Sequence, residues 1–436
     1  MNGFGVAQAA IGFAIMLALL GAGVHVAVAM AFIGLLGSAL YLGWPAINAF
    51  GIQLWGATDS FTLLAVPLFV LMGEILVKGG VTARMYRALA VWLGPLPGGL
   101  LHTNIGASAL FAAVSGSSVA TAATIGTVAL PAFADRRYDQ RLVLGTIAGG
   151  ATLGILIPPS INMIIYGAMT NTSVGRLYAA GVVPGLLLTG LFMAITALAC
   201  VIRPALAGGR EPRRPPGESL RALADLAPPV ALFVVVMGSI YAGWATPTES
   251  AAVGVIAALC LALAYRQLTL AGLLDCFETT VTVTAMILLI VASAFYLNFV
   301  LGILGVPQAL TSFVTSLGLD RTEFLFVLFA FYLILGCFLE TLSMMVGTIP
   351  IVFPIVAAYG IDPVWFGIFL VLMCEIALIT PPVGMNLYVV QGVRSSGSIG
   401  DVIAGTLPFL AMLVALTLAL IAFPGIALWL PNRAFS

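Results

Sequence analysis

The sequence contains few charged residues, and this scarcity decides its class. Only 7% of its 436 residues are Asp, Glu, Lys or Arg, whereas 62% are hydrophobic. Soluble domains carry about 25% charged and about 45–50% apolar residues. We therefore expect an integral membrane protein surrounded by membrane lipid. The formal net charge is zero and no basic stripe is present, so the sequence gives no sign of nucleic-acid binding.

Groups that carry out catalysis or bind transition metals are also scarce. The chain has two histidines and five cysteines, and the cysteines are scattered without paired spacing. This pattern predicts neither a disulfide framework nor a zinc site. There is no HExxH motif and no nucleophile–base pair, so an enzyme is not expected. There is no Walker A motif either, which argues against a pump driven by ATP.

Long apolar runs are what the sequence does contain. Stretches such as 182–202, 226–244 and 402–430 reach or approach the roughly 20 residues that a helix needs to cross a bilayer. They do not alternate between polar and apolar residues, as the strands of a membrane barrel do. The expected fold class is therefore an all-α polytopic membrane protein.

Landmarks in the first part of the chain recur in the second. Three residue pairs are each separated by 223 residues (354 − 131, 362 − 139 and 381 − 158): Pro131 and Pro354, Asp139 and Asp362, and Pro158 and Pro381. Between the two copies lies the segment 203–225, rich in Pro, Gly and Arg, which we interpret as a cytoplasmic linker. The expected domains are an N-terminal half, 1–202, and a C-terminal half, 226–436.

The two repeats are expected to have inverted orientations in the membrane. The loop after Pro131 carries Arg136, Arg137 and Arg141, whereas its counterpart after Pro354 carries no basic residue. Because basic loops stay on the cytoplasmic side, the two loops should face opposite sides. Inverted repeats with interrupted helices are typical of secondary transporters, whose substrate site lies near the middle of the membrane.

Each repeat contains a Pro-Pro pair that should break a helix, one within 141–170 and the other within 363–392. A proline has no N–H, so the carbonyl four residues earlier loses its helical partner. Unwound backbone at membrane depth is tolerated only where protein or a water-filled cavity surrounds it. Free carbonyls suit a cation such as Na⁺, and the start of the following half-helix suits an anion. The carbonyls concerned are those of Gly154, Ile155, Ala377 and Leu378.

A polar stretch precedes each broken helix. The segment 102–131 is interrupted by Ser115-Gly116-Ser117-Ser118, and we interpret it as two short helices that meet at a tip inside the membrane. The second hairpin is expected at about 325–357, around the stretch Gly336–Gly347. The serine hydroxyls could add ligands to a Na⁺ site. Alternatively, such small residues simply let membrane helices pack closely.

Several other polar residues are candidates for contact with substrate or cation. Asn162 and Asn386 follow the two breaks, where an amide could bind substrate or satisfy unwound backbone. Ser343, in the second hairpin, is a further substrate candidate. Acidic residues inside a membrane are functional candidates because burying their charge is costly. Glu340 lies beside the second tip and could bind cation or shape the tip, whereas Glu375 has no evident partner in the sequence.

In combination, these motifs resemble a known family. The stretches "SGSSVATAATIG", "GILIPPS", "IDPVWFGI" and "LITPPVGMNLYVV" resemble the large membrane subunit of TRAP (tripartite ATP-independent periplasmic) transporters, and the likeness covers essentially the whole chain. The resemblance implies an elevator-type, Na⁺-driven importer in the bacterial inner membrane. Its substrate would be a small organic acid such as a C4-dicarboxylate or sialic acid, delivered by a periplasmic binding protein. A separate small four-helix membrane subunit is also implied.

The resemblance also implies two Na⁺ sites. The first would use the tip residues Ser115, Gly116, Ser117 and Ser118 together with Gly154, Ile157 and Pro159. The second would use Gly336 and Thr341 together with Ala377, Thr380 and Val383. No arginine that binds substrate is assigned by motif.

Two other functions remain open at this point. A self-sufficient Na⁺/dicarboxylate symporter of a related inverted-repeat kind would predict Ser-Asn-Thr at both tips, and neither "SGSS" nor "ETLS" has it. A membrane-embedded enzyme would need the catalytic groups that are missing above.

Overall fold

The computed structural model describes residues 6–134, 136–208, 215–394 and 396–435. Within these ranges the regular structure is helical, apart from one isolated bridge between Tyr138 and Ala207. The all-α membrane fold expected from composition is therefore confirmed. Among the described residues, seven helices are long and apolar enough to cross a membrane, or eight if the bent pair α4–α5 forms one span.

The helices of the first half end before the polar segment in mid-chain. They are α1 (Val6–Gly21), α2 (Val26–Gly37), the π-helix η1 (Ser38–Leu42), α3 (Trp44–Thr58), α4 (Ala65–Lys78), α5 (Val81–Leu93), α6 (Leu100–Ser115), α7 (Ser118–Phe133), α8 (Gln140–Leu156), α9 (Ile161–Thr170), α10 (Val174–Ile202) and the short 3₁₀-helix η2 (Pro204–Leu206).

The second half contains α11 (Pro216–Tyr241), α12 (Pro247–Ala264), α13 (Leu270–Ile303), α14 (Val306–Ser316), α15 (Arg321–Gly336), α16 (Thr341–Ala358), α17 (Pro363–Ile379), α18 (Met385–Val393), α19 (Ile399–Ala422) and α20 (Gly425–Ala434).

The segment 203–225 is only partly a linker. Residues 209–214 lie outside the described structure, but α11 begins at Pro216, so 216–225 is the first part of a 26-residue helix. Proline at the first helical position costs no hydrogen bond, because that N–H has no partner in a helix anyway. Pro216 therefore starts a helix where the sequence suggested a polar connector.

The order of elements repeats along the chain. The bent pair α4–α5, the hairpin α6–α7 and the broken pair α8–α9 correspond to α13–α14, α15–α16 and α17–α18. Gly80 and Gly305 precede α5 and α14 with the same positive φ of 73°, a conformation that glycine adopts without steric cost. Asp139 and Asp362 cap α8 and α17 by accepting hydrogen bonds from backbone N–H groups of the first turn.

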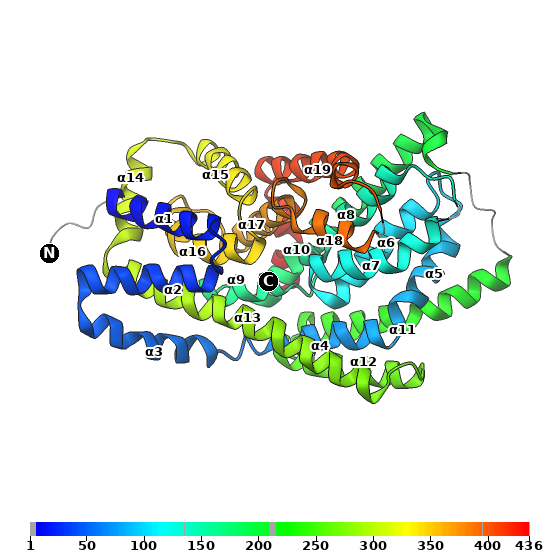
Figure 1. Ribbon diagram of the computed structural model, residues 1–436, viewed down its shortest axis with the longest axis horizontal. Coiled ribbons are helices and arrows are strands. Elements are labelled where there is room, and N and C mark those ends of the chain that lie inside the picture. The colour runs from blue at the N-terminus through cyan, green and yellow to red at the C-terminus, as the bar shows by residue number, and fades with distance from the viewer. Residues whose placement is uncertain (1–5, 135, 209–214, 395, 436) are drawn as a thin grey trace.

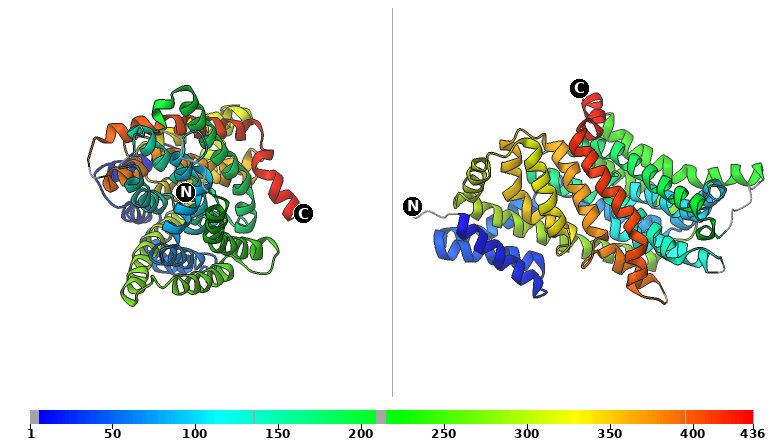
Figure 2. Two further views of the ribbon diagram at one scale, coloured as in Figure 1. Left: turned by 90° about the vertical axis from the view of Figure 1, so that its right-hand side faces the viewer. Right: turned by 90° about the horizontal axis from the view of Figure 1, so that it is seen from above.

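The two broken helices occupy the centre of the bundle. Figure 1 shows α8, α9, α17 and α18 near the middle of an elongated molecule, with α2, α3 and α14 toward one end and α5 and α11 toward the other. Every residue of α17 from Val364 to Ile379 is buried. Figure 2 shows α19 crossing the bundle obliquely, while α20 and the C-terminus project from it. The first break, with Pro158, Pro159 and Ser160 buried, is therefore surrounded by protein, as unwound backbone at membrane depth requires.

Close helix contacts around α8 depend on glycine. A side chain at Gly145 would overlap the carbonyl of Gly405 in α19, and one at Gly149 would meet the Phe409 ring at 2.6 Å. Glycine at these positions lets the N-terminal halves of α8 and α19 pack with their backbones in contact. This packing holds the first broken helix against its neighbours.

Candidate functional site

The candidate site has two parts, which we call the first and second half-sites. The first half-site consists of the tip 115–118 between α6 and α7, the end of α8 from Gly154, and the break 157–160 before α9. The second half-site consists of the tip 336–341 between α15 and α16, the end of α17 from Ala377, and the break 380–384 before α18. The sequence predicted these segments as candidates, and the structure places each tip against the break of its own half.

The tip and the break of the first half-site are in direct contact. Gly116 has φ 63°, and its carbonyl accepts a hydrogen bond from the Ile161 N–H at 3.4 Å. A Cβ at Gly116 would lie 2.8 Å from the Pro159 carbonyl oxygen. A Cβ at Gly154 would lie 2.6 Å from the Cα of Ser118. Glycine is required at both positions because backbone meets backbone there.

The hydroxyl protons at the first tip are engaged by the protein. The Thr121 hydroxyl donates to the Ser117 carbonyl at 2.7 Å, so the Ser115 hydroxyl, 3.2 Å from the Thr121 oxygen, must be the donor of that pair. The Ser118 hydroxyl donates to the Thr152 carbonyl at 3.2 Å. A hydroxyl has one proton and two lone pairs. Ser115 and Ser118 therefore offer free lone pairs, as ligands of a cation do.

Ser117 has a different part in the tip. Its hydroxyl accepts from the Ala120 N–H at 3.4 Å and so caps the start of α7. One of its lone pairs is therefore used by the helix. Ser117 is a weaker candidate ligand than its two neighbours.

The prolines of the first break leave backbone carbonyls without helical donors. Pro158 and Pro159 have no N–H, so the carbonyls of Gly154 and Ile155 cannot be paired within the helix. Ile157 ends α8 with extended backbone, at ψ 123°, and Pro158 and Pro159 are buried. The peptide bond between the two prolines is cis, as is the bond between Pro381 and Pro382.

The second half-site repeats this contact with different side chains. The Val383 N–H donates to the Cys337 carbonyl at 3.3 Å, and a Cβ at Gly336 would lie 2.8 Å from the Ala377 side chain. Thr380 ends α17 in extended conformation, and its hydroxyl donates to the Ile376 carbonyl at 2.6 Å. The lone pairs of Thr380 are therefore free, as at the first tip.

Glu340 and Ser343 form the cap of α16. The Glu340 Oε1 atom accepts from the Ser343 N–H at 2.9 Å and from the Ser343 hydroxyl at 3.0 Å. The Glu340 carboxyl thus lies at the positive end of a helix dipole, which stabilises it. The sequence left two roles open for Glu340, cation binding and shaping of the tip. Its hydrogen bonds in the structure are those of a residue that shapes the tip. The Ser343 hydroxyl, with its proton held by Glu340, can only accept from a further ligand.

The two asparagines are buried and have unpaired amide atoms. Asn162 lies in the first turn of α9, and its Nδ2 has no partner in the described part of the chain. Asn386 in α18 donates from Nδ2 to the Ala148 carbonyl at 3.5 Å, while its Oδ1 has no partner among the described residues. An unpaired buried polar atom costs about 1–3 kcal/mol. Each asparagine therefore keeps one buried polar atom that the described part of the chain does not satisfy.

The half-sites differ in exposure. Break 157–160 is buried apart from the half-buried Ile157, whereas Pro382, Met385 and Tyr388 at the second break are exposed. The Tyr388 hydroxyl donates to the Pro382 carbonyl at 3.1 Å. The second half-site is therefore the one that can be approached from outside the chain.

Glu375, an acidic candidate for which the sequence offered no partner, has its partners in the structure. It is fully buried in α17, and it accepts hydrogen bonds from the Ile155 N–H at 3.3 Å and from the Ser118 hydroxyl at 3.5 Å. Both partners belong to the first half-site, although Glu375 lies beside the second. The burial of an acidic residue in an apolar helix is the signal that the sequence offers.

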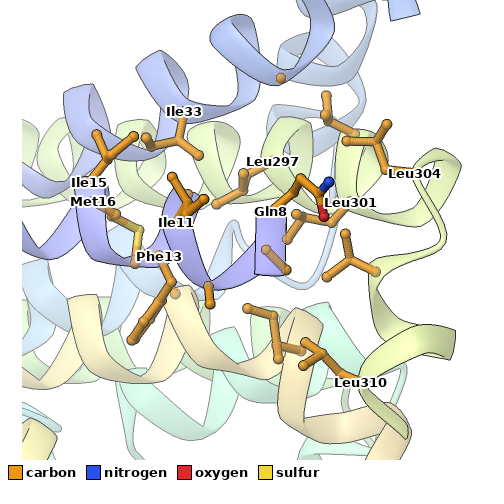
Figure 3. Close-up of a pocket in the computed structure, with 18 of the residues that line it drawn as sticks. Gln8, Ile11, Phe13, Ile15, Met16, Ile33, Leu297, Leu301, Leu304 and Leu310 are labelled. Atoms are coloured by element: carbon orange, nitrogen blue, oxygen red, sulfur yellow. The ribbon is translucent and has the colours of Figure 1, made fainter. Parts of the chain in front are cut away.

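Two cavities lie outside the half-sites. One, of about 300 Å³, is lined mostly by apolar side chains of α1, α2, α13, α14 and α16, and Figure 3 shows Gln8 as the labelled polar residue among them. Its polar lining consists of Gln8, Tyr41 and Thr348, and it includes no Arg or Lys. The other, of about 640 Å³, lies where α5, α7 and α11 meet and includes Arg87, Arg136 and Glu218. Neither includes a tip or a break.

Comparison with known proteins identifies the family of the chain. The sequence model "Tripartite ATP-independent periplasmic transporter, DctM component" matches residues 13–426. The chain is 38% identical to the C4-dicarboxylate TRAP transporter large permease protein DctM of Pseudomonas aeruginosa, over 89% of this chain and 90% of that protein. It is 35% identical to the sialic acid TRAP transporter large permease protein SiaM of Vibrio cholerae, over 95% and 96%.

Solved structures show the same fold in a more distant protein. The YdaH transporter of Alcanivorax borkumensis superposes with a TM-score of 0.67 at 14% identity, over 96% of this chain and 99% of that one. This likeness concerns the fold alone. The relatives that match in sequence are transporter permeases rather than enzymes. The chain is therefore a multi-pass protein of the bacterial inner membrane and belongs to the DctM component family of the tripartite ATP-independent periplasmic transporters.

Proposed function

We propose that this chain imports a small organic acid, drives the import with Na⁺, and receives its substrate from a periplasmic binding protein. The observation that carries the proposal is the meeting of helix ends at the two half-sites. Four helices, α6, α8, α15 and α17, end there, and four others, α7, α9, α16 and α18, begin there. Helix C-termini attract cations and helix N-termini attract anions.

The Na⁺ ligands would come from the C-terminal ends. The Gly154 carbonyl faces a break whose prolines cannot donate to it. The Ala377 carbonyl accepts a hydrogen bond from the Thr380 N–H at 3.4 Å, which leaves it one lone pair for a cation. The hydroxyls of Ser115, Ser118 and Thr380 have their protons engaged elsewhere and their lone pairs free. Such oxygen ligands bind a hard cation without a carboxylate.

The organic acid would lie near the N-terminal ends of α9 and α18. The unpaired amide atoms of Asn162 and Asn386 lie in these helices, both in the first turn. The Asn162 amide can donate to a carboxylate, and the Asn386 oxygen can accept from a hydroxyl or amino group. C4-dicarboxylates and sialic acid, which appear in the names of two relatives, are carboxylated compounds, and this pair of amides fits such a substrate.

Transport would proceed by an elevator movement of the two hairpins and the two broken helices together. Glu375 accepts hydrogen bonds from residues of the first half, and Asn386 donates one to the first half. These bonds support an elevator movement because they tie the two half-sites into one body. A small membrane subunit would complete the permease, consistent with the description "large permease" of the relatives.

A reconstitution experiment tests this proposal. The chain would be placed in liposomes with or without the small membrane protein and secreted binding protein from the neighbouring reading frames. Uptake of radiolabelled succinate and of radiolabelled sialic acid would be measured with and without an inward Na⁺ gradient. We expect accumulation of one of them only when both partners and the gradient are present.

Two outcomes would contradict the proposal. Strong uptake by the chain alone would support the self-sufficient symporter. Uptake that depends on a proton gradient and not on Na⁺ would contradict the Na⁺ coupling, while leaving the proposed arrangement of hairpins and broken helices in place.

A further inference from the structure

Glu375 joins two parts of the molecule that are far apart in sequence. The residue lies in α17, and its side chain is fully buried. Its Oε1 atom accepts from the Ile155 N–H, 220 residues away, and its Oε2 atom faces the Ser118 hydroxyl, 257 residues away. A residue beside the second break therefore contacts both the tip and the broken helix of the first half-site.

The preceding residue makes the corresponding contact in its own half. The Cys374 thiol donates to the Thr341 carbonyl at 3.6 Å. Ser118 and Thr341 are the first residues of α7 and α16, and they lie at equivalent positions of the repeat, 223 residues apart (341 − 118). Two adjacent residues of one helix thus reach equivalent points on both hairpin tips.

The contact with Ile155 also sets the direction of a candidate Na⁺ ligand. The Ile155 N–H and the Gly154 carbonyl belong to the same planar peptide group and point in opposite directions. Because Glu375 holds the N–H, the Gly154 carbonyl points away from the carboxyl. This is the carbonyl that Pro158 leaves without a helical donor.

The contact with Ser118 also orients a candidate Na⁺ ligand, the Ser118 hydroxyl oxygen. The Ser118 hydroxyl has one proton, which is shared between the Thr152 carbonyl at 3.2 Å and Glu375 at 3.5 Å. Because the proton points toward these two acceptors, the lone pairs of the Ser118 oxygen point away from them. Glu375 therefore orients one side-chain oxygen and one main-chain oxygen of the same half-site.

We propose that Glu375 is a positioning residue for the first half-site, which fixes the Gly154 carbonyl and the Ser118 hydroxyl for cation binding, and that Cys374 and Glu375 together couple the two hairpin tips. This rests on the proposed Na⁺ coupling. Glu375 does not bind the cation itself, but acts through the two oxygens that it orients. The binding of Na⁺ at one tip is then transmitted to the other through α17.

The test measures Na⁺ binding to the purified chain in detergent. Na⁺ would be titrated against choline at constant ionic strength, and the midpoint of thermal unfolding would give an apparent Kd, because a ligand that binds only the folded state raises this midpoint. Glu375→Gln keeps the size of the side chain but can present an amide donor to Ser118, which would take up one of its lone pairs. We expect about tenfold weaker Na⁺ binding. The matched control is Glu278→Gln, at an exposed position of α13, which should bind as the parent chain does.

A double-mutant cycle separates positioning from a general loss of stability. If Glu375 acts through Ser118, the pair Ser118→Ala and Glu375→Gln should weaken Na⁺ binding by less than the product of the single effects. Multiplicative effects, or an unchanged Kd in Glu375→Gln, would overturn the positioning role. Should Glu375→Gln fail to fold, Glu375→Asp, which moves the carboxyl back by one methylene, must show the weaker binding instead. The parent chain is measured first. If Na⁺ does not raise its unfolding midpoint, the proposed Na⁺ coupling itself is overturned.

Discussion

At the scale of single residues, the candidate site depends on where hydroxyl protons point. Ser115 donates to Thr121, which donates in turn to the Ser117 carbonyl. The chain of donors leaves the Ser115 lone pairs available. Ser117, which the sequence predicted as an equivalent candidate ligand, uses one lone pair to cap α7. The structure therefore ranks three serines that look alike in the sequence.

Replacement of Ser115 tests this ranking. Loss of one ligand oxygen of several costs about 1 kcal/mol, so Ser115→Ala should raise the Na⁺ concentration for half-maximal uptake about five-fold. Uptake would be measured in liposomes with the partner proteins, and the control is Ser316→Ala, whose hydroxyl bonds only to the Phe313 carbonyl in α14 among the described residues. Unchanged Na⁺ dependence in Ser115→Ala would reassign Ser115 to helix packing.

Residue types alone could not have shown the role of Glu375. Its partners are a backbone N–H 220 residues away and a hydroxyl 257 residues away, and only the packing of α17 against α8 and the first tip brings them together. The prolines, in contrast, could be interpreted from the sequence. A missing N–H is a property of the residue itself and does not depend on the surroundings.

At the scale of helices, the breaks at the Pro-Pro pairs determine which carbonyls are free. Asp139 and Asp362 start α8 and α17, and both helices run for 17 residues before they break. The helix start and the break are thus repeated at the same spacing in each half. Local sequence determines both, which is why the broken helices were predictable within a residue or two.

The helix that the sequence did not predict is the beginning of α11. Its first ten residues carry Pro, Gly and charged side chains, a composition typical of a connector. Pro216 nevertheless occupies the first helical position, where proline is favoured, and Glu218 lies in the first turn. Composition averages over the segment, whereas helix initiation depends on the position of each residue.

Replacement of Pro158 tests whether the break in the helix frees the Gly154 carbonyl for Na⁺. Pro158→Ala restores an N–H that can donate to the Gly154 carbonyl and so withdraw it from the cation. We expect a larger rise in the Na⁺ requirement for uptake than in Ser115→Ala, more than about tenfold, because a main-chain ligand is lost and the end of α8 is altered. The control is Pro228→Ala in α11, which also lies inside a helix but away from both half-sites. A Na⁺ requirement equal to that of the parent chain would show that the Gly154 carbonyl is no ligand.

At the scale of the whole molecule, the order of the elements repeats, and the charges distinguish the two copies. Arg136 and Arg137 follow α7, whereas the corresponding turn after α16 carries no basic residue. A membrane protein keeps its basic loops in the cytoplasm, so this difference predicts opposite orientations of the two halves.

Labelling with a membrane-impermeant thiol reagent tests the orientation. Cysteines would be introduced as Arg137→Cys and Ala358→Cys, two exposed positions at the ends of α7 and α16, in a chain whose exposed Cys260 is replaced. Asp362 is avoided because its carboxylate caps α17. We expect Ala358→Cys to react from the periplasm and Arg137→Cys only after the membrane is opened. Reaction of both from one side would reject the inverted repeat, and the chain without the new cysteines serves as the blank.

The two Pro-Pro breaks have a consequence for how this chain can diverge. The oxygens that they free belong to the main chain, so a neighbouring residue can change its side chain without removing a ligand. A deletion or insertion within 154–160 or 377–383, by contrast, would shift every oxygen out of place. Apart from Gly154, Thr380 and the prolines, tolerance of substitution and intolerance of length change should therefore occur together in these segments. The half-sites already differ in this way, since the first tip carries Ser117 and Ser118 and the second carries Glu340 and Thr341, while the prolines keep their spacing. A site built from main-chain atoms is inherited with the fold, and the side chains around it remain free to vary as the cargo changes.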